Sequence, residues 1–250
     1  MDVATHWQEA LTQQARLSPG QRTLQLLAPP GEDAPDVLRQ LVDEAIVEQF
    51  RGREAVCEGF RFEVSVLSSS AELDLAPLLG HPLGLRLDGP QPRTWFGVCT
   101  EVGLTGSDGG LARYTLVIEP FTALLRLRRN ALVFQDLDVQ GIVSRVLDDH
   151  PLSAFRWEAT QALPVRAITT QYREDDVAFL ERLLAEAGLA WHFELDESAP
   201  AGHVWVIRDR DAPVPALGTV RFQRLDISEH DDAINLFGDR LQAAPIASAV

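Results

Sequence analysis

The sequence lacks lysine altogether, so all 22 of its basic side chains are arginines. Aspartate and glutamate number 37, which gives the 250-residue chain a formal net charge of −15 at pH 7. A surface this acidic repels the phosphate backbone of nucleic acids. The densest basic cluster, Arg126, Arg128 and Arg129, is too small to offset that charge, and we interpret it as a solvated face or a protein contact. We therefore expect no nucleic-acid partner.

Cysteine is almost as scarce. Cys57 and Cys99 are the two cysteines of the chain, and they are not spaced as a CxxC pair. This excludes a disulfide framework and a thiolate metal site. Both lie in segments that we interpret as strands, so we expect two free, buried thiols that pack as small hydrophobic side chains.

Long apolar runs are missing too. No window approaches about eighteen uninterrupted apolar residues, so we expect no membrane-spanning helix. Asp2 and Glu9 occupy the positions where a secretory signal carries basic residues, which argues against a signal peptide. The overall composition, 46% apolar and 24% charged, is ordinary for a globular protein.

The segment 54–119 has the pattern of antiparallel β-structure. Apolar residues alternate with polar ones over 60–66 and again over 83–87, which predicts strands with one buried face. A further strand begins at Trp95, where Gly97 suggests a bulge or a sharp bend. The turn at 106–110 predicts a hairpin whose second strand covers 114–118. Such regular spacing is typical of a small barrel or sandwich.

The flanking segments are more mixed. Residues 1–20 predict a short amphipathic helix, 23–27 a brief strand, and 37–47 either a helix or a strand. Residues 139–147 have helical spacing behind Asp138, a suitable N-cap.

A clearer helix follows the acidic residues 174–176 and ends at Gly188. Strands at 191–194 and 204–207 then form a hairpin, which makes an α+β unit, and another strand is predicted at 220–227.

Three acidic or histidine clusters resemble catalytic or metal sites. Adjacent strand residues point in opposite directions, so the 230–232 cluster (His-Asp-Asp) is poorly arranged to chelate a metal. In the 148–150 cluster (Asp-Asp-His) we interpret His150 as a favourable charge at a helix C-terminus. Glu174, Asp175 and Asp176 could form a carboxylate acid–base pair, but placement at a helix N-terminus accounts for all three.

Other catalytic signals are weak. No metalloprotease, nucleophile-elbow or phosphate-loop motif occurs. Trp95, Trp157, Trp191 and Trp205 could form a carbohydrate platform, although their strand contexts favour core or interface packing. We expect no catalytic residue, no cofactor and no metal.

Five stretches in order resemble one family. Residues 171–189 (QYREDDVAFLERLLAEAGL) resemble the QYxE(S/T)DxxFxxRLLEExG stretch of the VgrG family of type VI secretion spike proteins and of their phage tail-hub relatives. The other four matches are EGFRF at 58–62, LLG at 78–80, FGV at 96–98 with LTGSDG at 104–109, and YTLVIEPFTALL at 114–125. The resemblance covers roughly residues 22–240.

The resemblance implies a structural, non-enzymatic hub of α+β, β-rich fold. An N-terminal helical extension (1–21) would precede a first tube-docking antiparallel β-barrel (22–127), an α+β insert (128–211) and the beginning of a second barrel (212–250). Three chains would place six barrels on the hexameric Hcp tube, and a PAAR protein would cap a needle formed by later parts of the chain. The protein would assemble in the bacterial cytoplasm and leave through the type VI system.

Because the chain ends at Val250, the neck and needle would be missing, and we expect a piece of a longer protein or a truncated product. Two alternatives stay open. One is the tail hub of a contractile phage or phage-like particle. The other is a cell-wall or lipid hydrolase or a carbohydrate-binding module.

Overall fold

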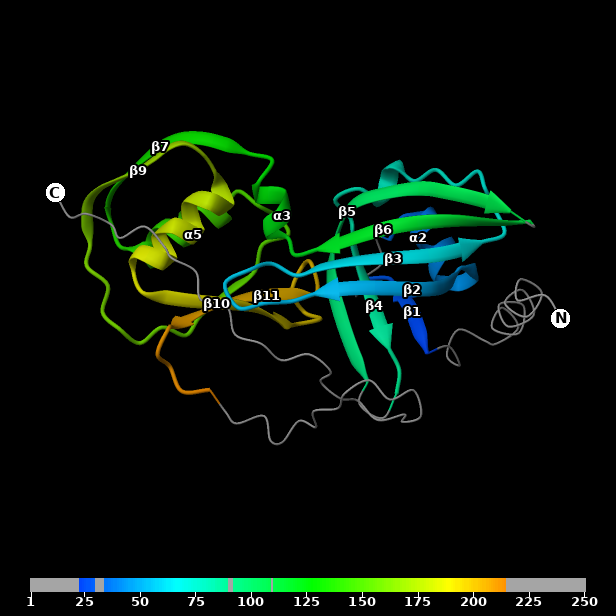
Figure 1. Cartoon of the computed structure of the whole chain (residues 1–250). Coiled ribbons are helices and arrows are strands. Elements are labelled where there is room, and N and C mark those ends of the chain that lie inside the picture. The colour runs from blue at the N-terminus through cyan, green and yellow to red at the C-terminus, as the bar shows by residue number, and fades with distance from the viewer. Residues whose placement is uncertain (1–22, 30–33, 90–91, 109, 215–250) are drawn as a thin grey trace, which may run out of the picture. The chain divides into compact units, whose positions relative to one another are not determined.

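The computed structural model describes residues 23–29, 34–89, 92–108 and 110–214 (Figure 1). Every helix and strand reported below lies within residues 1–210, the first of the two units into which the chain divides. The helix predicted for 1–20 and the strand predicted for 220–227 fall outside the described residues. Within the described part, no helix has the length and apolar character needed to cross a bilayer.

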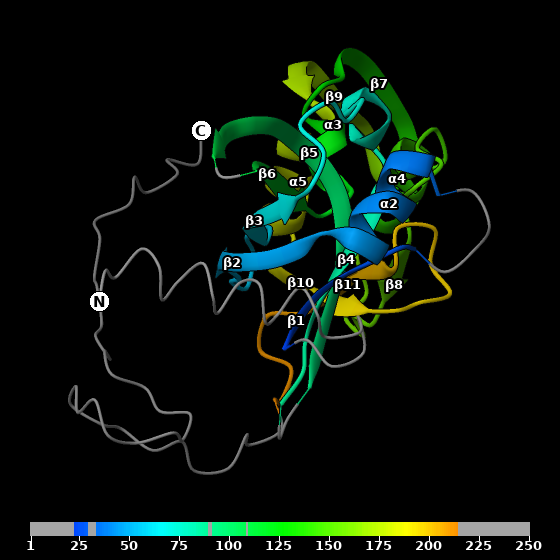
Figure 2. The same ribbon diagram turned by 90° about the vertical axis from the view of Figure 1, so that its right-hand side faces the viewer.

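The N-terminal half forms a nearly closed antiparallel barrel (Figure 2). Its strands follow the spatial order β1-β4-β5-β6-β3-β2, and the edge strands β1 and β2 approach each other without forming a ladder. The bounds are β1 (Leu24–Leu27), β2 (Ile46–Arg53), β3 (Arg61–Ser68), β4 (Pro82–Leu87), β5 (Arg93–Asp108) and β6 (Leu111–Glu119). The predicted barrel is therefore confirmed.

Two short helices accompany the barrel, α2 (Asp36–Glu44) and the 3₁₀-helix η2 (Ala76–Leu78). The ambiguous segment 37–47 resolves into helix α2 and the start of strand β2. Leu38 and Leu41, three residues apart, share one helical face and are buried in the barrel core. Val47 already pairs with Val66 of β3.

The alternation predicted for β3 holds at its start, where Phe62 and Val64 are fully buried. It is wrong at Ser65, which we expected to face solvent and which is buried. Ser65 lies in register between Gln49 of β2 and Thr115 of β6, so strands flank its small side chain on both sides.

Gly97 does not form the predicted bulge or sharp bend. Strand β5 pairs regularly with β4 at this point, and its irregularities lie further along, at 99–101 and 104–106. A Cβ atom on Gly97 would lie 2.5 Å from the carbonyl oxygen of Glu119 and 2.9 Å from the ring of Phe60. Glycine is therefore required because the backbone of the neighbouring strand passes too close for a side chain.

The C-terminal half is an α+β unit whose helix α5 lies between two small sheets (Figure 1). Strands β7 and β9 form an antiparallel pair, and the other sheet has the order β10-β11-β8, with β8 parallel to β11. The bounds are α3 (Thr122–Leu125), β7 (Arg129–Leu137), α4 (Val139–Leu147), β8 (Phe155–Trp157), β9 (Arg166–Asp175), α5 (Asp176–Glu186), β10 (Leu189–Leu195) and β11 (His203–Asp209). The predicted helices and hairpin are confirmed, and Asp138 caps α4 by accepting a hydrogen bond from the Gly141 N–H.

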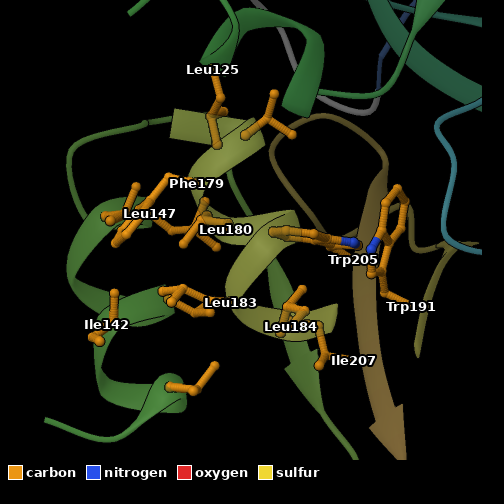
Figure 3. Packing of buried hydrophobic residues seen from close by; sticks show 14 of the residues in the cluster. Leu125, Ile142, Leu147, Phe179, Leu180, Leu183, Leu184, Trp191, Trp205 and Ile207 are labelled. Atoms are coloured by element: carbon orange, nitrogen blue, oxygen red, sulfur yellow. The ribbon is translucent and has the colours of Figure 1, made fainter. Parts of the chain in front are cut away.

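The core of this unit is built around the apolar stripe of α5 (Figure 3). Leu180 and Leu183 lie against Ile142 and Leu147 of α4 on one side. The opposite side of α5 faces the indole of Trp205. Full burial of one leucine contributes about 2 kcal/mol, so this stripe supplies much of the stability of the unit.

The tryptophans pack into the two cores, as predicted. Trp191 and Trp205 are buried and meet edge to face, with ring centroids 5.4 Å apart. Trp157 packs against the same cluster, and Trp95 packs against the barrel core.

The prediction for the cysteines is correct at one position only. Cys99 is buried, and this burial raises the pKa of its thiol to about 12. Cys57 is exposed, which corrects the prediction of a buried strand residue. It lies in a turn with φ 57°, where its N–H donates to the carbonyl of Trp191.

Replacing Gly97 with alanine should lower the free energy of unfolding by about 1–3 kcal/mol, because the added methyl group meets backbone of β6. Gly103 on the same strand is the matched control, since a Cβ there would have no neighbouring atom within 4 Å. Gly103→Ala should change stability by less than about 0.5 kcal/mol in the same denaturant titration. Equal losses in the two variants would contradict the close-approach explanation.

Candidate functional site

Three charged segments that are distant in the sequence meet at one buried carboxylate. They are the arginine cluster 126–129, the segment 148–150 and the acidic segment 174–176. Asp176, the first residue of α5, lies at the centre, and its side chain is 0% exposed.

Four side chains bind this carboxylate. The Arg128 Nε donates to Oδ2 at 2.6 Å, and the His150 Nε2 lies 3.1 Å from the same oxygen. The Asn130 Nδ2 and the Gln171 Nε2 each donate to Oδ1 at 2.8 Å. The backbone N–H of Asp176 also donates to the Arg128 carbonyl at 3.1 Å. We call these five residues the Asp176 network.

The hydrogen bonds decide the charge of the network. Burial by itself would raise the pKa of Asp176, but the bonds from Gln171, Asn130, Arg128 and His150 outweigh it and hold that pKa below its usual value. Burial would likewise lower the pKa of Arg128, yet its bonds to Asp176 and to Asp149 raise it. The pair is therefore charged at neutral pH.

The three acidic residues 174–176 perform three different tasks. Asp175 is the N-cap of α5 and accepts a hydrogen bond from the Ala178 N–H at 2.9 Å. Glu174 belongs to β9 and forms an ion pair with Arg182 at 2.9 Å. The prediction that all three residues stand at a helix N-terminus is therefore correct for Asp175 and wrong for Glu174. For Asp176 it is incomplete, because the partners of this residue come from other elements.

Gln171 lies five residues before Asp176 in the sequence and forms a hydrogen bond with its carboxylate. Its Nε2 donates both to the Glu174 carbonyl, at 3.1 Å, and to Asp176. The amide therefore stabilises the turn between strand β9 and helix α5. Both partners are acceptors, which fixes the orientation of the amide. The buried Oε1 of Gln171 then has no hydrogen-bond partner.

The segment 148–150 also differs from expectation. Asp148 is the C-cap of α4, and Asp149 forms an exposed ion pair with Arg128 at 3.1 Å. The ring of His150 points at Asp176 rather than acting through the helix end alone. Arg128, which we expected on a solvated face or in a contact with another protein, therefore binds within its own chain.

The geometry of the Asp176 network favours a role in stabilising the fold over a catalytic role. The central carboxylate is closed to solvent and its two oxygens are already occupied by donors, so it has no open position for a substrate. Across the described residues, no three or more His, Cys, Asp or Glu side chains are grouped to hold a metal ion. The cluster at 230–232 lies outside the described residues.

A second buried polar group, His203, joins β11 to the end of the barrel. Its Nε2 accepts the Phe121 N–H at 3.0 Å, and its Nδ1 lies 2.9 Å from the Ala201 carbonyl, to which it donates. The ring stacks on Phe121 and meets Phe60 edge-on. Burial lowers the pKa of His203 to about 4, so the ring is neutral. A single histidine at a strand start gave no sequence signal for this role.

A hollow of about 260 Å³ lies beside His203 and is lined in part by Glu54, Arg93, Trp95 and Phe193. Two of its charged residues, Glu54 and Arg93, bind each other: Glu54 accepts hydrogen bonds from Arg93 at 3.2 Å and from the Trp95 indole at 3.1 Å. The Arg93 guanidinium also lies 4.7 Å from the centre of the Trp95 ring. This hollow resembles a contact surface more than an enclosed substrate site.

A nearly closed barrel followed by this α+β unit defines a tail-hub-like chain. A family model described as phage tail baseplate hub (GPD) matches residues 53–250, and the chain belongs to this family.

Two curated relatives are type VI secretion system spike proteins of Pseudomonas aeruginosa. The chain is 37% identical to VgrG5 over 171 residues, which are 67% of this chain and 21% of that protein. It is 36% identical to VgrG4b over 176 residues, 69% of this chain and 21% of that protein. The chain therefore spans about a fifth of the length of these relatives, and the resemblance to the VgrG family is confirmed.

Two solved structures share the fold of this chain. The Escherichia coli c3393 protein, described as a component of the type VI secretion system with structural similarity to the phage T4 tail proteins gp27 and gp5, aligns with a TM-score of 0.60 at 26% identity. The alignment covers 82% of this chain and 52% of that one. A tail protein from Neisseria meningitidis shares the fold with a TM-score of 0.56 at 15% identity, over 82% of this chain and 56% of that one.

Asp176→Asn should destabilise the chain by about 2–4 kcal/mol, because it leaves Arg128 without its counter-charge and turns an amide toward existing donors. The estimate allows for the partial exposure of Arg128. Asp175→Asn is the matched control: asparagine caps helices as well as aspartate, so its change should stay within about 0.5 kcal/mol. Urea unfolding at neutral pH measures both, and similar losses would show that the network adds little.

Acidification should lower the free energy of unfolding, because it protonates the buried ring of His203. The folded pKa of about 4 lies below the ordinary value of 6.5, so the unfolded chain binds the proton more readily. The contribution of neutral His203 to the free energy of unfolding is fully present above about pH 6.5. It is lost as the pH falls toward 4, and the total loss is about 3 kcal/mol. Unfolding titrations from pH 4 to 8 should show this slope flattened in His203→Gln and retained in His192→Gln, a histidine substitution that leaves His203 in place. An unchanged slope in His203→Gln would refute the assignment.

Proposed function

We propose that the chain is the N-terminal hub region of a type VI secretion spike, a structural and non-enzymatic part that forms a trimer and docks on the hexameric Hcp tube. The observation that carries this proposal is the 37% identity to VgrG5, a spike protein, over two thirds of the chain. The stretch 171–189 adds to it, because its glutamine and second aspartate build the Asp176 network.

Symmetry supports an assembly role. In the proposed arrangement residues 22–127 form the first barrel, 128–211 the insert, and 212–250 begin a second barrel. A trimer of chains with two similar barrels offers six equivalent positions, which match a hexameric ring through repeated interfaces. The formal charge of −15 would govern solubility and the choice of partner.

The same proposal gives the other partners and the location. Later parts of a longer chain would carry the needle and its PAAR tip. The protein would assemble in the bacterial cytoplasm and be secreted by the type VI system. The charged residues 148–150 and 174–176 support a non-catalytic role, because they take part in helix capping, ion pairs and the Asp176 network.

The tail hub of a contractile phage or phage-like particle is the second candidate, favoured by the description of the matching family. The region that follows the hub in the parent gene separates the two: a needle or an effector extension indicates secretion, and a lytic domain indicates a phage. A hydrolase would require turnover of a cell-wall or lipid substrate that is lost in His230→Ala or Asp232→Ala variants.

The mass of the longer parent chain in solution tests the proposal. We expect a trimer by light scattering, and co-elution with a purified Hcp-type ring during size-exclusion chromatography. The control is a ring-forming protein of similar size from outside secretion systems, which should elute separately. A parent that is strictly monomeric and ignores Hcp-type rings would overturn the hub assignment. The 250-residue chain alone should associate weakly.

A further inference from the structure

The hollow of about 260 Å³ beside His203 is bordered by strands from two different sheets. Residues 93–96 of β5 line it from the barrel, and residues 193–195 of β10 line it from the α+β unit. Strand β10 is an edge strand of its sheet, and β10 and β11 lie beside β5 (Figure 2). We call this space the His203 hollow.

One hydrogen bond shows which main-chain groups of β10 point to its free edge. The Trp191 carbonyl accepts from the Cys57 N–H at 2.9 Å, and therefore points away from β11. Alternate residues of an antiparallel strand direct their N–H and C=O groups to the same side, so Phe193 and Leu195 point to the free edge too. Both residues line the His203 hollow, and among the described residues their main-chain groups have no hydrogen-bond partner.

Strand β5 has an open stretch on the other side of the hollow. The Cys99 N–H donates to the His81 carbonyl, which lies on the β4 side. By the same alternation Thr94 and Phe96 point away from β4, and β5 pairs with β6 only from residue 98 onward. The Phe96 carbonyl is directed at the His203 ring, which agrees with this orientation. Within the described part of the chain, the Phe96 N–H and both main-chain groups of Thr94 are left without a backbone partner.

Apolar side chains from both units also line the hollow. The rings of Phe60 and Phe193 meet edge to face at a centroid distance of 5.6 Å, and Leu195 is 50% exposed. An apolar side chain bound here would remove part of this surface from water. The hollow is smaller than the usual small-molecule site of about 300–1,000 Å³, and three strand residues extend only about 7 Å. Its size therefore fits a short stretch of extended chain.

The charges around the hollow are acidic on balance. Its lining has the carboxylates of Glu54 and Glu194 and the guanidinium of Arg93. Glu194 pairs with Arg156, which also pairs with Glu158, so this neighbouring pair adds no net charge. One negative charge is left, on a chain whose formal charge is −15. A basic ligand is the complementary one.

We propose that the His203 hollow binds an extended segment of a partner protein, in which apolar residues alternate with basic ones, by strand addition. The open N–H and C=O groups of a strand edge match the spacing of another strand, which is why the occupant is an extended peptide. Its main chain bonds to β10 and β5, its apolar side chains contact the aromatic lining, and its basic side chains lie near Glu54 and Glu194. This binding goes beyond the proposed hub function and requires neither a trimer nor a ring.

Fluorescence anisotropy of the 250-residue chain with a labelled, capped Arg-Val-Arg-Val-Arg peptide tests the proposal. We expect saturable binding with a dissociation constant below about 1 mM, because a short edge supports only weak affinity. The acidic counterpart Glu-Val-Glu-Val-Glu should bind at least about tenfold more weakly. Two further versions carry N-methyl groups on the valines or on the arginines. At least one of them should also lose about tenfold, since strand addition requires alternate N–H groups.

A pair of leucine variants locates the site. Leu195→Lys should raise the dissociation constant of the basic peptide by about tenfold, because it removes an apolar contact and adds a repelling charge. Leu104→Lys is the matched control: Leu104 is 49% exposed and lies on β5 outside the hollow, so binding should change less than about twofold. Both variants should keep the circular dichroism spectrum of the unmodified chain.

Four results would each overturn this inference. They are the absence of saturable binding below about 1 mM, equal binding of the acidic peptide, full binding of both methylated versions, and equal losses in the two lysine variants. None of them bears on whether the longer parent forms a trimer and binds Hcp-type rings, so this inference and the proposed function can fail separately.

Discussion

The ion pair between Arg128 and Asp176 is the contact on which the C-terminal half depends. Removing a carboxylate from water costs several kcal/mol, and this cost is recovered only when donors saturate the oxygens, as Arg128, Asn130, Gln171 and His150 do here. Arg128 lies directly before β7 and Asn130 within it, His150 follows the C-cap of α4, and Gln171 belongs to β9. The start of α5 is thereby fixed relative to three elements, and α5 carries the apolar stripe around which the whole unit packs (Figure 3). Any other placement of the helix would leave a buried charge unpaired.

The same network also sets what β9 shows to solvent. Because successive strand residues point to opposite faces, the inward position of Gln171 forces Tyr172 outward. An irregularity in the pairing at Asn130 and Ala131, opposite Arg173 with φ 54°, then allows the chain to turn into the N-cap of α5. One strand thus binds a buried carboxylate through Gln171 on one face and exposes Tyr172 on the other.

Local patterns were enough to predict much of this fold. Helices α4 and α5 and the hairpin β10–β11 each carry their own caps, turns and periodicity, and the alternating residues of β3 and β4 identify the barrel. Strands β7 and β9 were not predicted, because their apolar residues Val133 and Ile168 face outward and their partners lie more than 30 residues apart in the chain. The Asp176 network was missed for a related reason. Arg128 and Asn130 lie 48 and 46 residues from Asp176, and nothing in a local pattern distinguishes a capping aspartate from its buried neighbour.

The Asp176 network also holds the two-stranded sheet β7–β9 in place. A two-stranded sheet has little stability by itself, so it requires support from the elements packed against it. Here β7 contributes Asn130 and β9 contributes Gln171 to the buried carboxylate, and Phe134 of β7 stacks on Phe179 of α5 at a centroid distance of 5.5 Å. These contacts hold both strands against α5.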